Sequence, residues 1–136
     1  MTLRRLPACF VLAAALLAGG CQSSSESVGP MQGTWVVDID ATLAGAKADG
    51  MPERYAPKIR ETYQGARLEI TDDALLLGLV GGSGETMHMD YKVTGRKGDC
   101  YSVEVSGAPA TSEMCFAGDV LRMRDGEKLT VVYKRA

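Results

Sequence analysis

Four cysteines and one histidine are the side chains of this 136-residue chain best suited to chemistry near neutral pH. A cysteine can carry a lipid, form a disulfide or bind a metal. Cys9 and Cys21 lie near the N-terminus, whereas Cys100 and Cys115 lie towards the C-terminus. His88 is the only histidine, so an acid–base or metal role for it needs partners from elsewhere in the chain. The role of each residue depends on the element that positions it.

The first 20 residues have the organisation of a secretory signal. Arg4 and Arg5 supply positive charge, and residues 6–20 then contain no charged side chain and are rich in Leu, Ala and Val. This apolar run is shorter than the roughly 20 residues that a permanent membrane span needs. A serine-rich tract follows at once, which argues against a buried helix. We therefore expect residues 1–20 to be removed from the mature protein.

The junction LAGGC (residues 17–21) resembles the lipobox of bacterial lipoproteins, in which small residues precede a cysteine. The resemblance implies cleavage before Cys21, diacylation of its thiol (palmitate-type chains) and acylation of the new amine. Each buried methylene adds about 0.8 kcal/mol to membrane affinity, so such an anchor is stable. Gln22 follows the cysteine where Asp would favour the inner membrane, so the resemblance implies the outer membrane. The alternative is a plain secretory signal cut nearby.

Residues 21–32 then comprise a lipidated cysteine and a small, polar, flexible tether. Removal of Arg4 and Arg5 leaves 13 basic against 17 acidic residues, a net charge of −4. No basic stripe is present, so nucleic acid is not an expected partner. We expect the domain to lie in the periplasm or at the cell surface, with the membrane as its partner through the acyl chains.

The rest of the chain alternates apolar and polar residues with a period of two, interrupted by Gly and Asp turns. A two-residue turn between the second and third runs places Ile70 opposite Leu75 and Leu68 opposite Leu77. Regularly spaced short strands are typical of a small closed barrel. The pattern predicts a mainly β, eight-stranded antiparallel up-and-down barrel. Its expected strands are residues 34–40, 67–71, 74–80, 85–93, 100–105, 111–116, 120–124 and 128–135.

The cysteines test this register. If residues 106–109 form a hairpin loop, Cys100 lies directly opposite Cys115, and both side chains lie on the outer face of the barrel. With the two N-terminal cysteines assigned to the signal and the anchor, these two remain as a pair in an oxidising compartment. We expect a cross-strand disulfide worth about 3 kcal/mol in the chain-entropy model. A metal site from two cysteines and the single histidine lacks a fourth ligand.

The segment between the first two predicted strands breaks the alternation. Asp40 is the expected cap of a short helix that runs through Ala48. Tyr55, Ile59 and Tyr63 then recur every four residues, as they do along one stripe of a second helix. We expect this helical insert to pack the stripe across one end of the barrel or on its side.

The triplet GTW (residues 33–35) at the start of the first predicted strand is similar to the G-x-W signature that begins lipocalins. With the predicted barrel, the domain over residues 33–136 is similar to the compact lipocalin-like lipoproteins of Gram-negative bacteria. The resemblance implies that Trp35 closes one end of the barrel. The domain departs from ordinary lipocalins in its short length and in a helix that follows the first strand rather than the last. The resemblance implies no particular function.

The inward positions of these elements supply the candidate interior residues. They are Trp35, Tyr55, Ile59, Met87, Met89, Tyr91, Tyr101, Met114 and Phe116. Such side chains either fill a packed core, in which Met occupies irregular gaps, or line an apolar cavity for a lipid-like molecule. With few residues for eight strands and a helix to plug one end, we favour the packed core.

No catalytic constellation is visible in the sequence. His88 is expected on the solvated outer face of its strand, without a second ligand or a nucleophile, and the aspartates occupy turns and outward positions. We therefore expect no cofactor and no enzymatic activity. The predicted function is a binding or accessory module for a small apolar ligand or an envelope protein. The alternative is an inhibitor of a protease or a lysozyme.

Overall fold

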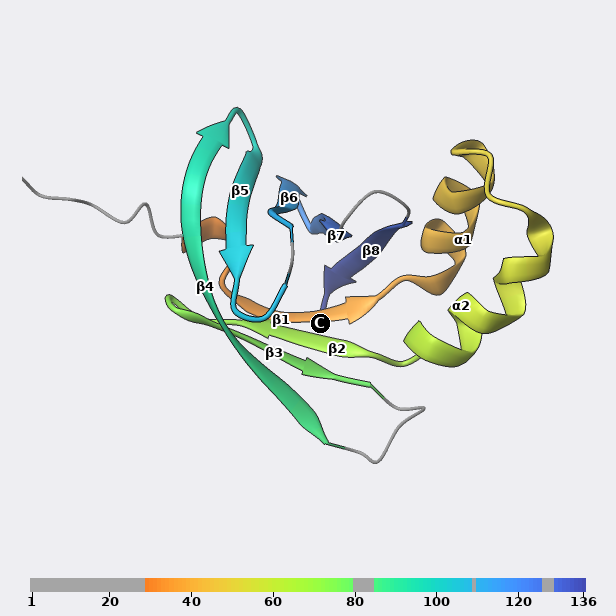
Figure 1. Ribbon diagram of the computed structural model, residues 1–136, viewed down its shortest axis with the longest axis horizontal. Helices are drawn as coiled ribbons and strands as arrows, with labels where there is room; N and C mark the ends of the chain where they lie inside the picture. The colour runs from red at the N-terminus through yellow and green to blue at the C-terminus, as the bar shows by residue number, and fades with distance from the viewer. Residues whose placement is uncertain (1–28, 80–84, 109, 126–128) are drawn as a thin grey trace, which may run out of the picture.

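The computed structural model describes residues 29–79, 85–108, 110–125 and 129–136 (Figure 1). The predicted signal segment at residues 1–20, Cys21 and most of the predicted tether lie outside the described residues, so the structure does not bear on them.

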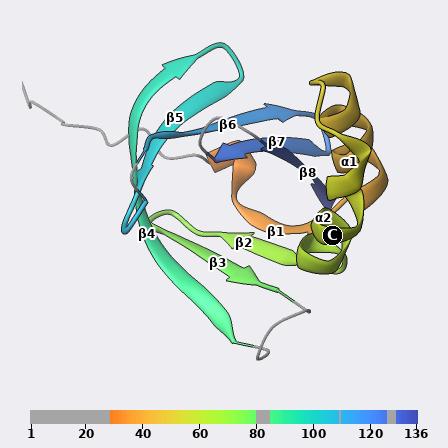
Figure 2. The ribbon, with the colours of Figure 1, turned by 45° about the vertical axis from the view of Figure 1, so that its right-hand side comes forward.

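Eight antiparallel strands form a closed barrel in which each strand pairs with its neighbours in sequence and the last strand pairs back with the first (Figures 1 and 2). The predicted fold class is therefore confirmed, and so is the register that places Ile70 opposite Leu75 and Leu68 opposite Leu77. The strands are β1 (Gly33–Val37), β2 (Arg67–Ile70), β3 (Ala74–Gly78), β4 (Thr86–Lys97), β5 (Cys100–Val105), β6 (Ser112–Ala117), β7 (Val120–Asp125) and β8 (Leu129–Arg135).

The helical insert follows β1, as predicted, and lies beside the end of the barrel where β1 finishes and β2 begins (Figure 2). It comprises α1 (Ile39–Ala48), a 3₁₀ turn η2 (Glu53–Tyr55) and α2 (Ala56–Tyr63).

The start of α1 differs from the prediction by two residues. The first strand was expected to reach Asp40, but β1 ends at Val37 and the cap is Asp38, whose carboxylate accepts a hydrogen bond from the Ala41 N–H at 3.1 Å. The side chain of Thr42 holds α1 against β8, because its Oγ1 accepts a hydrogen bond from the Val132 N–H at 2.9 Å. Helix capping and this docking override the strand-like alternation that continues to residue 39.

β4 changes partners along its length. Residues 86–90 pair with β3, and residues 91–97 pair with β5. The prediction that this strand ends at Val93 was wrong, because a register shift between Val93 and Gly95 absorbs the irregularity and lets the strand continue to Lys97. Its first half therefore runs with β3 away from β5 (Figures 1 and 2).

One end of the barrel, which we call the closed end, is filled around Trp35. This indole is fully buried, and its Nε1–H donates to the Met31 carbonyl at 2.8 Å. The Phe116 ring meets it edge-on at 6.0 Å between centroids, and the Arg135 guanidinium lies 4.3 Å from its centroid. Met31 belongs to a 3₁₀ turn, η1 (Gly29–Met31), that the sequence assigned to the tether. The packed domain therefore begins before residue 33.

Candidate functional site

At the opposite end, which we call the open end, the barrel holds a cavity of about 420 Å³. β3, β5 and β7 finish here, and β4, β6 and β8 begin. The cavity wall consists of inward side chains from β2 to β8, with Thr62 and Tyr63 of α2 beside them. Its volume lies within the ≈ 300–1,000 Å³ range of small-molecule sites. The packed core that the sequence favoured therefore does not extend through the whole barrel.

Three local features of the chain leave this space unfilled. β1 turns into α1 after Val37 and adds no side chain to the cavity wall. The connection from β5 to β6 contributes small residues, Ser106, Gly107 and Ala108, where larger side chains would close the mouth. β4 also diverges from β5 here, because residues 86–90 pair with β3 and only residues 91–97 pair with β5.

The residues that line the cavity carry no charge. Leu68, Leu77, Met123 and Val131 provide much of the apolar wall, and the Ser112 hydroxyl is one of a few polar groups. Burial of a charge without a partner costs several kcal/mol, so the cavity suits an uncharged apolar group. A charged headgroup of a ligand fits only outside the mouth.

Two of the candidate interior residues line the cavity. Met89 is half-buried, whereas Met87 is 45 % exposed because it lies on the diverging half of β4. The residues of the β5–β6 connection and Thr62 of α2 were missed by the sequence analysis. Alternation identifies inward strand positions but carries no signal for loop residues at a barrel mouth.

The other candidates lie elsewhere. Trp35, Tyr101 and Met114 are buried away from the cavity, and Phe116 is half-buried against Trp35. Ile59 is buried in the helical insert, where it borders a groove between α1 and α2. Tyr55 is not an interior residue, because it is 45 % exposed in η2, before α2 begins.

Tyr91 is buried at the point where β4 passes from β3 to β5. Its hydroxyl donates to the Thr71 carbonyl at 2.6 Å. Burial, followed by the nearby charges of Asp72 and Asp73, raises the pKa of this phenol to about 12. Tyr91 therefore stays neutral and acts as a structural tie between β4 and the β2–β3 turn.

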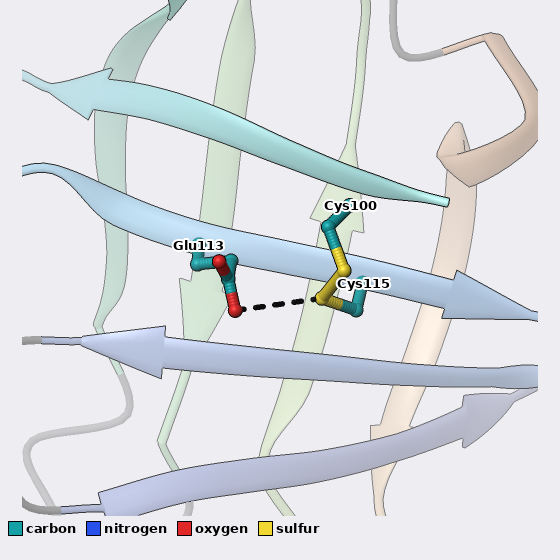
Figure 3. Close-up of side chains that lie close together, drawn as sticks. All are labelled: Cys100, Glu113 and Cys115. Carbon is teal, nitrogen blue, oxygen red and sulfur yellow. Dashed lines mark hydrogen bonds between the residues drawn. A yellow bond between two sulfur atoms is a disulfide. The ribbon is translucent and has the colours of Figure 1, made fainter. Parts of the chain in front are cut away.

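The predicted disulfide between Cys100 and Cys115 is present and links directly opposite residues of β5 and β6. Figure 3 shows Glu113 on the same face of β6, with its Oε1 3.6 Å from the Cys115 sulfur. Within the part of the chain that the structure describes, these three residues are the only group of three close metal-ligand side chains. Since the disulfide leaves neither cysteine as a thiolate, we interpret the group as a covalent staple.

His88 lies on the exposed outer face of β4, with its Nε2 3.6 Å from the Asp90 carboxylate. The aspartates considered as a carboxylate site do not come together. Asp38 caps α1, Asp40 lies 3.7 Å from an arginine of α2, and Asp73 contacts Thr71 within a turn. The open-end cavity is thus the strongest candidate site among the described residues.

The chain matches no protein-family model, no curated protein and no solved structure. Within the described residues, no helix combines the length and the apolar character needed to cross a membrane. The fold and the open-end cavity define the class: a small antiparallel β-barrel with one filled end and one end hollowed by an uncharged, largely apolar cavity.

Proposed function

We propose that this chain is a non-catalytic lipoprotein of the bacterial envelope whose barrel binds a small, uncharged, apolar ligand. The observation that carries the proposal is the cavity of about 420 Å³ at the open end, lined by uncharged residues from seven strands and α2. The position of Trp35 at the filled end of the barrel supports the similarity to compact lipocalin-like lipoproteins.

The apolar wall supplies the driving force for binding. A ligand that loses roughly 250 Å² of apolar surface gains about 6 kcal/mol at 25 cal/mol per Å². Apolar burial alone therefore supports a dissociation constant of about tens of micromolar or weaker, because association also costs translational and rotational freedom. Ligands with an apolar body and a polar tip fit best, because the tip can stay at the mouth beside Thr62 and Ser106.

The place where the described chain begins supports an orientation for the anchored protein. η1 lies at the closed end, where Met31 accepts the hydrogen bond from Trp35. The proposed tether therefore leaves the barrel at the closed end, and the cavity mouth lies at the opposite end. This arrangement favours exchange of the ligand with the periplasm rather than with the membrane that holds the anchor.

Ligand binding is tested with the fluorescent apolar probe N-phenyl-1-naphthylamine and the purified mature domain. Leu77→Trp fills the cavity, since Leu77 lines it, and we expect probe affinity to fall at least tenfold. Leu76→Trp is the matched control, because the adjacent residue of β3 faces the other side, and its affinity should stay within twofold. Absence of probe binding, or equal affinity in both variants, would contradict the proposal.

The anchor is tested separately in a Gram-negative expression host. Metabolic labelling with palmitate should mark the wild-type chain, and Cys21→Ser should abolish both the label and recovery in the outer-membrane fraction. A labelled Cys21→Ser chain, or an unlabelled wild-type chain, would show that the anchor is absent.

A further inference from the structure

The half of β4 that borders the cavity has an unpaired edge. Residues 86–90 pair with β3 on one side, whereas β5, the neighbour on the other side, ends at Val105 opposite Tyr91. Figures 1 and 2 show from two directions that this half-strand runs clear of β5.

The backbone directions at this edge follow from one hydrogen bond. The Tyr91 N–H donates to the Asp73 carbonyl at 3.1 Å, so residues 87 and 89 also direct their backbone groups to β3. The intervening residues, Thr86 and His88, therefore direct N–H and C=O to the opposite side. The Asp90 carbonyl accepts from the Ser106 N–H at 2.8 Å, which closes the edge beyond this point.

No backbone partner for Thr86 or His88 on that side is present among the described residues. Unpaired strand edges of this kind are templates for another extended chain, and proteins usually cover, shorten or charge them. Here the edge instead borders Met87, one of two large apolar side chains that are exposed in the described part of the protein. Across the gap from Met87, Val105 and Ala108 also line the cavity.

We propose that this edge binds an extended segment of another polypeptide, which adds a strand beside residues 86–89. Only an extended backbone matches N–H and C=O groups at strand spacing. Every second side chain of such a segment lies on the face of Met87, next to the cavity, and should be apolar. Exposed Asp90 lies on the opposite face of this half-strand, so a basic residue suits the alternate positions of the added segment.

A different protein, rather than a second copy, is the partner that the geometry favours. Two copies joined through the same edge would be related by a twofold axis across antiparallel strands, with their closed ends in opposite directions. The eight residue steps from Cys21 to Gly29 reach at most roughly 28 Å. The closed ends of two such copies would point away from each other, so tethers of this length could not easily place both anchors in one membrane. This step rests on the proposed lipid anchor, whereas the unpaired edge does not.

The test uses a fluorescein-labelled peptide of alternating lysine and valine, seven residues long, and the purified mature chain. Hydrogen exchange is the first readout. The amides of Thr86 and His88 should gain at least tenfold protection on peptide binding, whereas those of Met87 and Met89 should be protected throughout by β3. Protection elsewhere, or none, would overturn the proposal.

Two matched sets of reagents sharpen the test. N-methylation of the alternate peptide amides that face β4 should weaken binding at least tenfold, and N-methylation of the other set should change it less than twofold. His88→Pro removes the backbone N–H that points to the free edge, and the N–H groups of Met87 and Met89 that face β3 remain. His88→Ala is the control, because it keeps the N–H. We expect at least tenfold weaker binding for the first and less than twofold for the second.

Equal effects of the two methylated peptides would overturn strand addition even if His88→Pro fails to fold. Sedimentation that shows a dimer of the free wild-type chain, lost in His88→Pro, would overturn the choice of partner. The proposed ligand site and the proposed strand addition can fail separately. If the cavity does not bind N-phenyl-1-naphthylamine, protection of the Thr86 and His88 amides by the peptide still tests strand addition.

Discussion

At the closed end, Trp35 is held by a hydrogen bond to Met31, an edge-on contact with Phe116 and the guanidinium of Arg135, whose Nη2 also donates to the Pro30 carbonyl at 3.0 Å. At the open end, the same alternating strands surround a cavity of about 420 Å³, and Met87 is 45 % exposed. Both ends follow the same strand pattern, so the difference lies in what each end packs against.

At the closed end, η1 and the C-terminal residues of β8 both supply contacts to Trp35. The open end has the helical insert beside it, but of the insert only α2 lines the cavity, and β4 diverges from its neighbour there. A filled end that carries the stability leaves the other end free to hold a ligand, because interior voids cost stability in proportion to their size. The comparison predicts that equal substitutions have unequal effects at the two ends.

The largest expected difference comes from a pair of leucines. Leu121→Ala removes a fully buried side chain opposite Phe116 and should lower the free energy of unfolding by about 3 kcal/mol or more. Leu77→Ala removes a half-buried side chain that already borders the cavity and should cost about 1 kcal/mol. Urea unfolding at equilibrium measures both. Equal losses would show that the open end is packed as tightly as the closed end.

Loss of the disulfide should have the next largest effect on stability. Its replacement in the double variant Cys100→Ser, Cys115→Ser should lower the free energy of unfolding by about 3 kcal/mol in the chain-entropy model. The bond lies where β5 begins and β6 ends, away from the cavity, so affinity for N-phenyl-1-naphthylamine should change less than twofold. A large loss of probe affinity in the folded double variant would break the separation between the two ends.

The registers of two hairpins, β2–β3 and β5–β6, were predictable from the sequence, whereas the register shift in β4 and the cavity were not. Alternation with a period of two and the Cys100–Cys115 pair determine which residues face each other, and a shift by one residue would expose the apolar set. The packed volume depends instead on how far β4 diverges and on which loop residues reach the mouth. Neither quantity has a periodic signal.

The helical insert shows the same limit locally. Val37 and Ile39 continue the alternation, so a strand through Asp40 fits the pattern equally well. The outcome is decided by the Asp38 carboxylate at the N-terminus of α1 and by the long-range contact between Thr42 and β8. A contact over 90 positions of sequence leaves no local trace.

The pH dependence of stability tests the point where the two halves of β4 meet. The pKa of Tyr91 is about 12 in the folded protein and about 10 in an unfolded chain. The folded state therefore holds this proton more tightly, which gives a stabilisation that is complete below pH 10 and lost as the pH rises to about 12. The free energy of unfolding relative to Tyr91→Phe should be constant below pH 10 and fall by about 2 kcal/mol above it. Urea unfolding across this range measures the difference, and parallel curves would contradict it.

The smallest expected effect separates two neighbouring aspartates at the open end. Asp38→Ala removes the side chain that caps α1 and should lower the free energy of unfolding by about 1 kcal/mol. Asp40→Ala removes only an exposed carboxylate 3.7 Å from Arg60 and should change stability by less than about 0.5 kcal/mol. Because α1 fixes the insert to β8 and α2 borders the cavity, Asp38→Ala should also weaken probe binding slightly, about twofold, whereas Asp40→Ala should not. A larger loss of stability and of probe affinity in Asp40→Ala than in Asp38→Ala would show that Asp40 is the cap. It would also contradict the link between the Asp38 cap and the cavity.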